Sequence, residues 1–217
     1  MTSRDPSSQP TRKDVARNRQ RLLRAAREVF AQQGLDAGLD DIAHHAGVGV
    51  GTAYRHFADK QQLTVALMEQ AVEQFIADVT AVLQDNDPWQ GLVRYLELST
   101  NLQAKDRGLR HVLTGAYNPQ LFQDQLNQIL TLVEGIVQRA RSAEVIRSDA
   151  QSTDLMLLAH MLCTVADMTV EAQPDLWRRY LTMFLEGLKP GADALSVAAL
   201  PASEFHRIKP KPGPVVK

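Results

Sequence analysis

Residues 50–57 bring together side chains that can donate and accept hydrogen bonds. Thr52, Arg55 and His56 lie on one face of a predicted helix and supply a hydroxyl, a cation and an imidazole. The other side carries a stripe at helical spacing, formed by Val50, Ala53, Tyr54 and Phe57. Gly51 adds no side chain, so a partner can approach the backbone there. A small helix of this kind suits recognition of base edges and phosphates in nucleic acid.

A second helix must hold this one in place, and residues 40–46 are predicted to form it. Asp40 and Asp41 fall in its first turn, where carboxylates favour the positive end of the helix dipole. Gly47 follows as a turn residue that is free to adopt a positive φ. Two short helices joined by a glycine-containing turn are the helix-turn-helix arrangement, whose second helix lies in a DNA major groove.

This region resembles the recognition element of the TetR family of bacterial transcriptional repressors. The pattern of that family is matched by Asp41, Ile42, Ala43, Ala46, Gly47, Val48, Gly51, Thr52, Tyr54, His56, Phe57, Lys60 and Leu63. The motif covers about the first third of the chain. The resemblance implies an all-α protein, with an N-terminal three-helix DNA-binding domain that contains the helix-turn-helix, followed by a helical bundle for ligand binding and dimerisation.

Two positions depart from the family pattern. Gly38 stands where many members carry a Thr that caps the helix and touches a phosphate, and Gly49 stands where Ser is frequent as the N-cap of the recognition helix. Glycine is a tolerated cap that costs only a few tenths of a kcal/mol relative to Ser. These departures affect individual phosphate contacts rather than the DNA-binding role.

Charge places further candidates at the N-terminus. The net charge of −1 hides an asymmetry, because residues 1–27 hold eight Arg or Lys against two Asp, whereas residues 61–217 hold 14 basic against 18 acidic residues. A basic end on an otherwise acidic protein is typical of contact with a polyanion. Lys60 is predicted in the first turn of a helix, a poor place for a cation unless it meets a phosphate. The predicted DNA contacts are Arg12, Lys13, Arg17, Gly49, Val50, Gly51, Thr52, Tyr54, Arg55, His56 and Lys60.

Composition sets the class of protein and its compartment. The chain has 217 residues, of which 44% are hydrophobic, and no apolar run is long enough to span a membrane. Its N-terminus has no apolar segment, so no secretory signal is expected. Cys163 is the single cysteine, which excludes an internal disulfide framework and a cysteine-based zinc site. We expect a soluble cytoplasmic protein with no cofactor, no metal site and no membrane partner.

The rest of the chain is predicted to be helical. The expected helices cover residues 14–33, 60–84, 89–104, 107–116, 120–141 and 149–171, with a last one that starts at 173–175 and stops at 189–191. Gly34 is expected to end the first of them as a left-handed cap. The predicted domains are a flexible basic arm at 1–13, the DNA-binding domain at 14–60, the ligand-binding and dimerisation domain at 61–189, and a proline-rich flexible tail at 190–217.

Two sets of residues are predicted for the second domain. The late helices are apolar on more than one face, which predicts burial against a second copy. The predicted homodimer interface is formed by Leu158, Leu162, Val165, Trp177, Tyr180, Leu181, Phe184 and Leu188. The resemblance implies a small-molecule effector, and the absence of a charged cluster favours an apolar or weakly polar one. The candidate pocket residues are Phe75, Trp89, Tyr95, His111, Tyr117, Phe122, Met156 and His160.

The leading hypothesis is a ligand-responsive repressor that binds an operator in double-stranded DNA and leaves it when the small molecule binds. An enzyme with a helical active site lacks support, because there is no GxSxG, HExxH or phosphate-cradling glycine loop, and no catalytic residue is predicted. A helical module that binds a protein partner remains an alternative. A ligand-independent regulator or an activator remains another, because sequence cannot separate either from a repressor.

Overall fold

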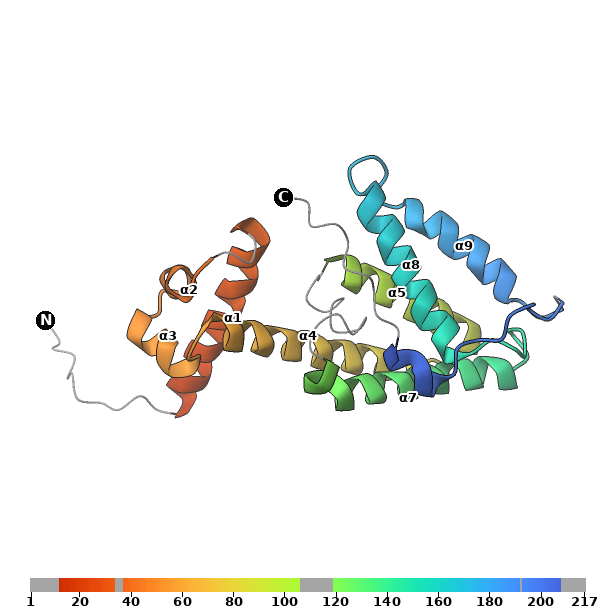
Figure 1. Cartoon of the computed structure of the whole chain (residues 1–217), viewed down its shortest axis with the longest axis horizontal. Coiled ribbons are helices and arrows are strands. Elements are labelled where there is room, and N and C mark those ends of the chain that lie inside the picture. Colours follow the sequence, from red (N-terminus) through yellow and green to blue (C-terminus); the bar gives the residue numbers. More distant parts are fainter. Residues whose placement is uncertain (1–11, 34–36, 106–118, 192, 208–217) are drawn as a thin grey trace, which may run out of the picture. The chain divides into compact units, whose positions relative to one another are not determined.

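The computed structural model describes residues 12–33, 37–105, 119–191 and 193–207, and every long regular element in these ranges is an α-helix. The all-α prediction is therefore confirmed. The chain divides into two compact units, residues 1–70 and 71–217. The helices are α1 (Arg12–Gln33), α2 (Leu39–Ala46), α3 (Val50–His56), α4 (Lys60–Leu83), α5 (Pro88–Lys105), α7 (Gln123–Ser142), α8 (Ser152–Thr169) and α9 (Leu176–Leu188) (Figure 1).

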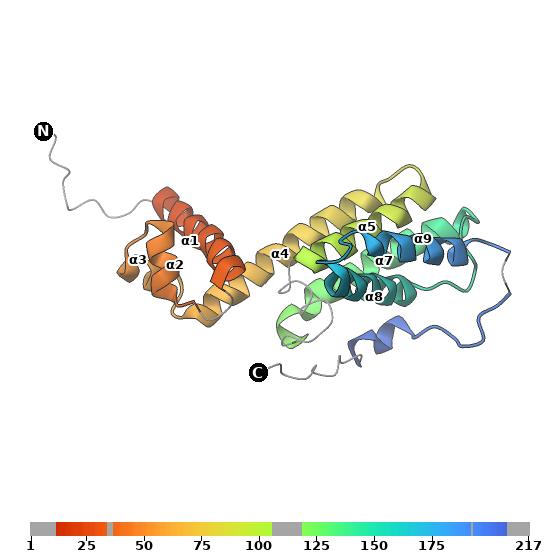
Figure 2. The same ribbon diagram turned by 90° about the horizontal axis from the view of Figure 1, so that it is seen from above.

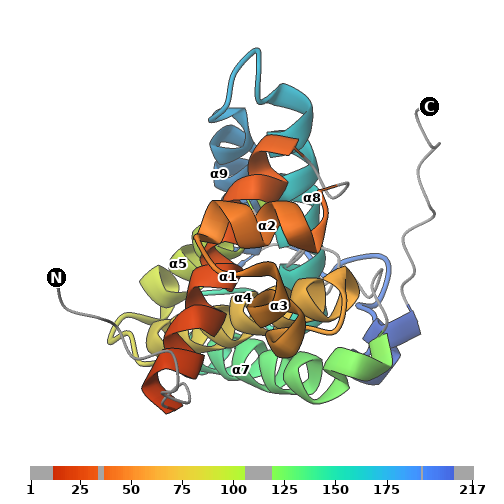
Figure 3. The same cartoon turned by 90° about the vertical axis from the view of Figure 1, so that its left-hand side faces the viewer.

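The first unit is built from α1, α2, α3 and the start of α4 (Figures 1 and 3). Its core is the apolar stripe of α1 packed on α2 and α3, with Leu22, Ala26, Ile42, Ala43 and Ala53 fully buried. The α1 helix begins at Arg12, two residues before its predicted start, so Arg12 and Lys13 are helical. The predicted cap at Gly34 lies outside the described residues.

Local hydrogen bonds define the helix-turn-helix. The Asp41 carboxylate accepts a hydrogen bond from the Gly38 backbone N–H at 3.0 Å, so α2 is capped from within although Gly38 has no side chain. Gly47 adopts φ +60°, and the following Val48 N–H donates to the Ala43 carbonyl. The Gly49 carbonyl then accepts the Thr52 and Ala53 N–H groups as α3 begins. The predicted positive φ at Gly47 is confirmed.

The second unit contains the rest of α4 and the helices from α5 onward. The α5 helix packs against α7 and α8, and α8 also packs against α7 and α9 (Figure 2). Phe75, Leu92, Leu96, Val133 and Leu162 are fully or almost fully buried in this unit. The predicted helix over 107–116 lies outside the described residues. The predicted start of the next helix is instead a short 3₁₀ turn, η2 (Pro119–Phe122), before α7.

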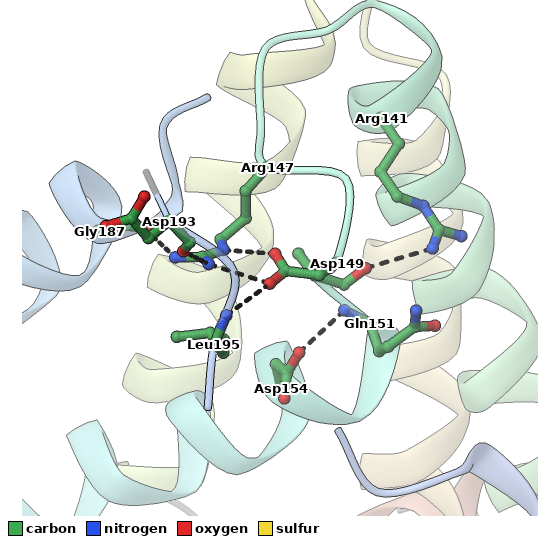
Figure 4. A network of polar contacts seen from close by, with 9 residues as sticks. Arg141, Arg147, Asp149, Gln151, Asp154, Gly187, Asp193 and Leu195 are labelled. Atoms are coloured by element: carbon green, nitrogen blue, oxygen red, sulfur yellow. Dashed lines mark hydrogen bonds and ion pairs between the residues drawn. The ribbon is translucent and has the colours of Figure 1, made fainter. Parts of the chain in front are cut away.

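The start of α8 and the chain after α9 differ from prediction for a shared reason. Arg147 donates to Asp149 (Nη2 to Oδ2, 2.9 Å) and to the Asp193 carbonyl at 2.6 Å, while Asp149 accepts the Leu195 N–H at 3.0 Å (Figure 4). The Asp149 carboxylate is therefore bonded to Arg147 and to the Leu195 N–H, and Asp149 lies before α8 rather than in it. Asp154 caps α8 by accepting a hydrogen bond from the Gln151 N–H.

Residues 193–207, which follow α9 in the predicted flexible tail, contact earlier segments of the second unit. Besides the contacts to Arg147 and Asp149, the Leu200 carbonyl accepts a hydrogen bond from the Thr153 hydroxyl at 2.7 Å. A short 3₁₀ turn, η3 (Ala202–Arg207), follows and packs near α8. We call residues 193–207 the C-terminal strap. None of the helices in the described ranges combines the length and apolarity needed to cross a bilayer.

Candidate nucleic-acid interface

The α3 helix is held by one face and exposes the other. Ala53 and the C-cap residue Phe57 are buried, and Val50 packs partly against the same core. On the outer face Arg55 is exposed, and Thr52 and His56 are half-buried. Tyr54, which was predicted on the stripe of the other side, is 49% exposed at the edge of that stripe. A Cβ atom added at Gly51 would meet nothing within 4 Å, so this position leaves open space beside the helix. The structure thus gathers the predicted polar residues of 50–57 on one accessible surface.

Arg55 lies back along its own helix. Its Nη2 donates to Thr52 Oγ1 at 3.0 Å, and its Nε donates to the Gly51 carbonyl at 3.2 Å. The Thr52 hydroxyl oxygen is thereby used as an acceptor, which leaves the hydroxyl proton free to point toward a partner. Without nucleic acid, Arg55 positions Thr52 as well as carrying charge on this face.

Tyr54 is tied to α2. Its hydroxyl hydrogen-bonds with Asp40, and this bond, the charge of Asp40 and partial burial together raise the pKa of the Tyr54 phenol. The phenol is the donor in this pair, because the carboxylate can only accept. The Asp40 carboxylate of α2 therefore lies beside the Tyr54 hydroxyl of α3.

Two arginines of α1 also belong to this surface, although sequence reasoning counted them only as charge. The Arg19 guanidinium stacks on the Phe57 ring, 4.9 Å from its centroid. Arg21 Nη2 donates to the Gly47 carbonyl at 3.4 Å and so supports the turn before α3. The pKa of His56 is lowered, first by burial and then by the charges of Arg19 and Arg55. For Arg21 the available signal was helical spacing, because it lies four residues after the predicted contact Arg17, whereas this spacing does not point to Arg19.

The remaining predicted DNA contacts lie at the edges of this surface. Arg12, Lys13 and Arg17 are exposed at the start of α1, where Arg17 pairs with Asp14 at 2.9 Å. Gly49 is exposed before α3, and Lys60 is half-buried at the first position of α4. All these candidates belong to the first unit, although Arg12 and Lys13 were expected in a flexible arm rather than a helix.

The pocket candidates of the second unit are mostly core residues. Phe75, Tyr95, Phe122 and Met156 are buried, and Trp89 and His160 are half-buried. His111 and Tyr117 lie outside the described residues. The described part of the chain contains no group of three or more His, Cys, Asp or Glu side chains placed to hold a metal ion.

The predicted dimer residues divide by burial. Leu158, Leu162, Trp177 and Leu181 are buried within the single chain because α8 packs on α5 and α9. Tyr180 and Phe184 are exposed, and Val165 and Leu188 are half-buried. The same two helices and their connection expose further large apolar side chains that sequence reasoning did not select, namely Met161, Met168, Val170 and Met183.

Known proteins match both units. A family model described as "Bacterial regulatory proteins, tetR family" matches residues 22–67, and one described as "Transcriptional regulator SbtR-like, C-terminal domain" matches residues 87–190. The HTH-type transcriptional regulator SAR0097 of Staphylococcus aureus is 33% identical over 101 residues, which are 42% of this chain and 53% of that protein. The chain thus spans about half the length of this curated relative.

Solved structures match a larger share of the chain. The TetR transcription regulatory protein from Mycobacterium vanbaalenii superposes with a TM-score of 0.61 at 28% identity, over 82% of this chain and 98% of that one. The regulator FadR from Bacillus subtilis, solved in complex with stearoyl-CoA, superposes with a TM-score of 0.61 at 20% identity, over 78% of this chain and 98% of that one. At this identity the second match shows the fold alone.

Proposed function

The chain belongs to the TetR family of bacterial transcriptional regulators, and we propose that it is a sequence-specific repressor that binds its operator as a homodimer and leaves it when a small molecule binds the second unit. The observation that carries the proposal is the outer face of α3, where Thr52, Arg55 and His56 are accessible, with the exposed Tyr54 at the edge of the opposite face that holds the helix. Such a face reads base edges when its helix enters a major groove.

The same surface carries the charge needed for a phosphate backbone. Arg12, Lys13 and Arg17 are exposed on the first turns of α1, and Lys60 lies at the start of α4. Lys and Arg contacts to phosphates release counterions, so binding weakens as salt concentration rises. Arg12, Lys13, Arg17 and Lys60 are proposed to position the protein, and the α3 residues are proposed to read the sequence.

The second unit supports the regulatory half of the proposal. Exposed apolar side chains on α8 and α9 favour a second copy of the chain as their partner, and two copies would present two α3 helices to successive major grooves about 34 Å apart. A ligand that prefers a different spacing of these helices would shift the dimer away from DNA. FadR from Bacillus subtilis, which shares the fold, was solved in complex with stearoyl-CoA, and this supports effector binding within such a fold. A protein of this kind acts in the cytoplasm.

Operator binding is tested by fluorescence anisotropy with a duplex taken from upstream of the gene, titrated at two salt concentrations. Arg55→Ala is expected to weaken specific binding about tenfold, and Tyr54→Phe to weaken it less, because it removes only the hydroxyl. Lys189→Ala is the matched control, since Lys189 lies in the second unit and pairs with the neighbouring Glu186. Unchanged specific binding in both α3 variants would rule out the assigned reading face.

A further inference from the structure

The methionines of the chain divide into a buried and an exposed group. The structure describes five of the six, and two of these, Met68 of α4 and Met156 of α8, are each only 8% exposed. Met161 and Met168 of α8 and Met183 of α9 are 48%, 80% and 61% exposed. Within the described ranges, the methionines that solvent reaches freely are therefore confined to α8 and α9.

These three side chains point away from the core of the second unit. Met161 and Met168 are seven residues apart, which places them on one face of α8 about two turns apart. Leu162, on another face of α8, is fully buried. Met183 is followed by the exposed Phe184 on α9, and α8 and α9 pack against each other (Figure 2). The three methionines thus belong to the exposed apolar side chains for which a second copy of the chain is the proposed partner.

The single cysteine of the chain is shielded, although it lies on the same helix. Cys163 falls between Met161 and Met168 in the sequence, but its side chain is fully buried. An oxidant dissolved in water must touch a sulfur atom to react with it, so it meets the exposed thioethers before the buried thiol. The first sulfur groups to react on this surface are therefore methionines.

A peroxide oxidises a thioether by transferring one oxygen atom to the sulfur. With hydrogen peroxide, a sulfur lone pair attacks one peroxide oxygen, the O–O bond breaks and an S–O bond forms. The second oxygen leaves as water, so sulfur loses two electrons and the peroxide gains them. The product is methionine sulfoxide, whose oxygen makes the formerly apolar side chain polar.

Sulfoxides on α8 and α9 oppose the association of two copies of the chain. Apolar side chains stabilise a protein interface because the contact removes them from water. A sulfoxide oxygen buried in the same contact loses its hydration, which costs free energy unless the partner supplies a hydrogen-bond donor. Each copy brings Met161, Met168 and Met183 to the contact, so the cost is repeated on both sides of the interface.

We propose that Met161, Met168 and Met183 form an oxidation site, and that their conversion to sulfoxides by a peroxide separates the protomers and so releases the operator. This inference rests on the proposed function, because it requires two copies that bind DNA together. In the proposed dimer the three side chains are covered, so oxidation proceeds through the dissociated protomer. Oxidised protomers then accumulate, because they no longer pair.

The first test follows the order of oxidation in the full-length protein without DNA. After treatment with hydrogen peroxide, peptide mass spectrometry records the gain of one oxygen atom at each methionine. Met168 and Met183 are expected to react about tenfold faster than Met68 and Met156. Raising the protein concentration should slow the reaction at the exposed methionines and leave the rate at Met68 constant.

Two results of this test would overturn the proposal. Equal rates at the exposed and the buried methionines would show that there is no preferred oxidation site on α8 and α9. A rate at Met168 and Met183 that does not depend on protein concentration would show that association leaves these side chains uncovered.

The second test measures the dissociation constant of the dimer by sedimentation velocity before and after peroxide treatment. Oxidation is expected to raise this constant about tenfold in the wild-type protein. In the triple variant Met161→Leu, Met168→Leu, Met183→Leu, peroxide should change the constant by less than about twofold, because leucine has no sulfur to oxidise. Met68→Leu combined with Met156→Leu is the matched control and should keep the tenfold response.

An oxidised wild-type dimer of unchanged stability would overturn the proposal. Loss of the response in Cys163→Ala would overturn it too, because the thiol would then be the sensitive group. Operator binding by the untreated protein is measured separately. If the untreated protein binds its operator as a dimer and the oxidised protein stays dimeric, the oxidation site is wrong and the proposed function stands. An untreated dimer that binds no operator would contradict the proposed function, whatever its response to peroxide.

Discussion

Arg55 has two roles on α3: it carries a positive charge, and its hydrogen bonds position the neighbouring Thr52 side chain. As a cation on the exposed face of α3 it suits a phosphate or a guanine edge. It also holds Thr52 through a 3.0 Å bond and is itself anchored on the Gly51 carbonyl. The two side chains therefore act as one unit, and single substitutions at either position disturb the other.

A double-mutant cycle measures this coupling. Arg55→Ala and Thr52→Val are each expected to weaken specific operator binding, and the double variant is expected to lose about 1 kcal/mol less than the sum of the two single losses. The physical reason is that each single change already removes the bond between them. Anisotropy titrations of all four proteins against one duplex provide the measurement, with Arg17→Ala combined with Thr52→Val as an uncoupled control. Additive losses would show that Arg55 and Thr52 act independently.

His56 makes operator binding sensitive to pH. In the free protein its pKa is lowered by burial, by Arg19 and by Arg55, so the imidazole is neutral at pH 7. A nearby DNA phosphate would raise the pKa again, so binding takes up a proton and affinity strengthens as pH falls. Between pH 7.5 and pH 6.0 we expect a gain of roughly threefold per site.

Titrations at the two pH values in His56→Gln test this assignment. The variant should lose most of the pH dependence. His45→Gln should keep it, because His45 faces Glu28 of α1 at 2.7 Å rather than the α3 surface. An unchanged pH dependence in His56→Gln would assign the proton to another group.

At the scale of elements, Arg147 and its partner Asp149 join the C-terminal strap to the connection between α7 and α8. The Arg147 side chain bonds Asp149, the Asp193 carbonyl and, at 3.4 Å, the Gly187 carbonyl, while its backbone N–H donates to the Leu188 carbonyl (Figure 4). The connection between α7 and α8 is thus joined to the end of α9 and to the strap. A buried arginine whose three side-chain nitrogens each donate a hydrogen bond is costly to truncate, because its partners are left unpaired.

Arg147→Ala is expected to release the strap and to lower the Tm by about 5 °C. Limited proteolysis should then cut within residues 193–200 at least tenfold faster than in wild type, because the segment loses its hydrogen bonds. Arg178→Ala, which removes an exposed pair with Glu97, is the control and should change neither measurement much. Equal cleavage rates in wild type and Arg147→Ala would show that other contacts hold the strap.

The stabilisation that the Arg147–Asp149 network contributes depends on pH. The hydrogen bond from Arg147, followed by the bond from the Leu195 N–H, lowers the pKa of Asp149 to about 2 from its ordinary 3.8. The stabilisation from this carboxylate is therefore complete above pH 3.8 and is lost as the pH falls toward 2. Proteolysis of the strap should be constant between pH 5 and pH 8 and should increase in acid. An increase already at pH 6 would point to a different titrating group.

At the scale of the whole molecule, the exposed apolar side chains of α8 and α9 need a partner. Met168 is 80% exposed and Met183 61% exposed, and Tyr180 and Phe184 lie on the same helix as Met183. Large apolar groups gathered on two neighbouring helices are typical of a protein interface. A second copy of the chain is the proposed partner.

Met183→Glu combined with Phe184→Glu is expected to convert the protein to a monomer, because charges placed in an apolar interface lose hydration without a partner. Sedimentation velocity gives the mass, and the operator titration gives the stoichiometry. Leu121→Glu is the control, since Leu121 is a similarly exposed apolar residue of η2 outside these helices. A dimer of unchanged stability in the double variant would place the interface elsewhere.

The sequence alone determined the helical class and the helix-turn-helix, because their signals are local. The turn at Gly47, the first-turn Asp41 and the stripe that buries Ala53 and Phe57 all act within a few residues, and each is in place in the structure. Helix boundaries were predicted to within a few residues, and the start of α8 shows why they were not exact. There Asp149 pairs with Arg147 and binds the Leu195 N–H, 46 residues away along the chain.

Only the tertiary structure decided which face of a two-faced helix is covered and which is left exposed. Leu158 and Trp177 were predicted at a dimer interface, but they are buried within one chain, while Met168 and Met183 are exposed. Periodicity shows that α8 and α9 are apolar on several sides, yet the neighbour of each side is chosen by contacts between distant segments. The placement of the C-terminal strap has the same origin, because the Thr153 hydroxyl and the Leu200 carbonyl are brought together only by folding and carry no signal in the local sequence.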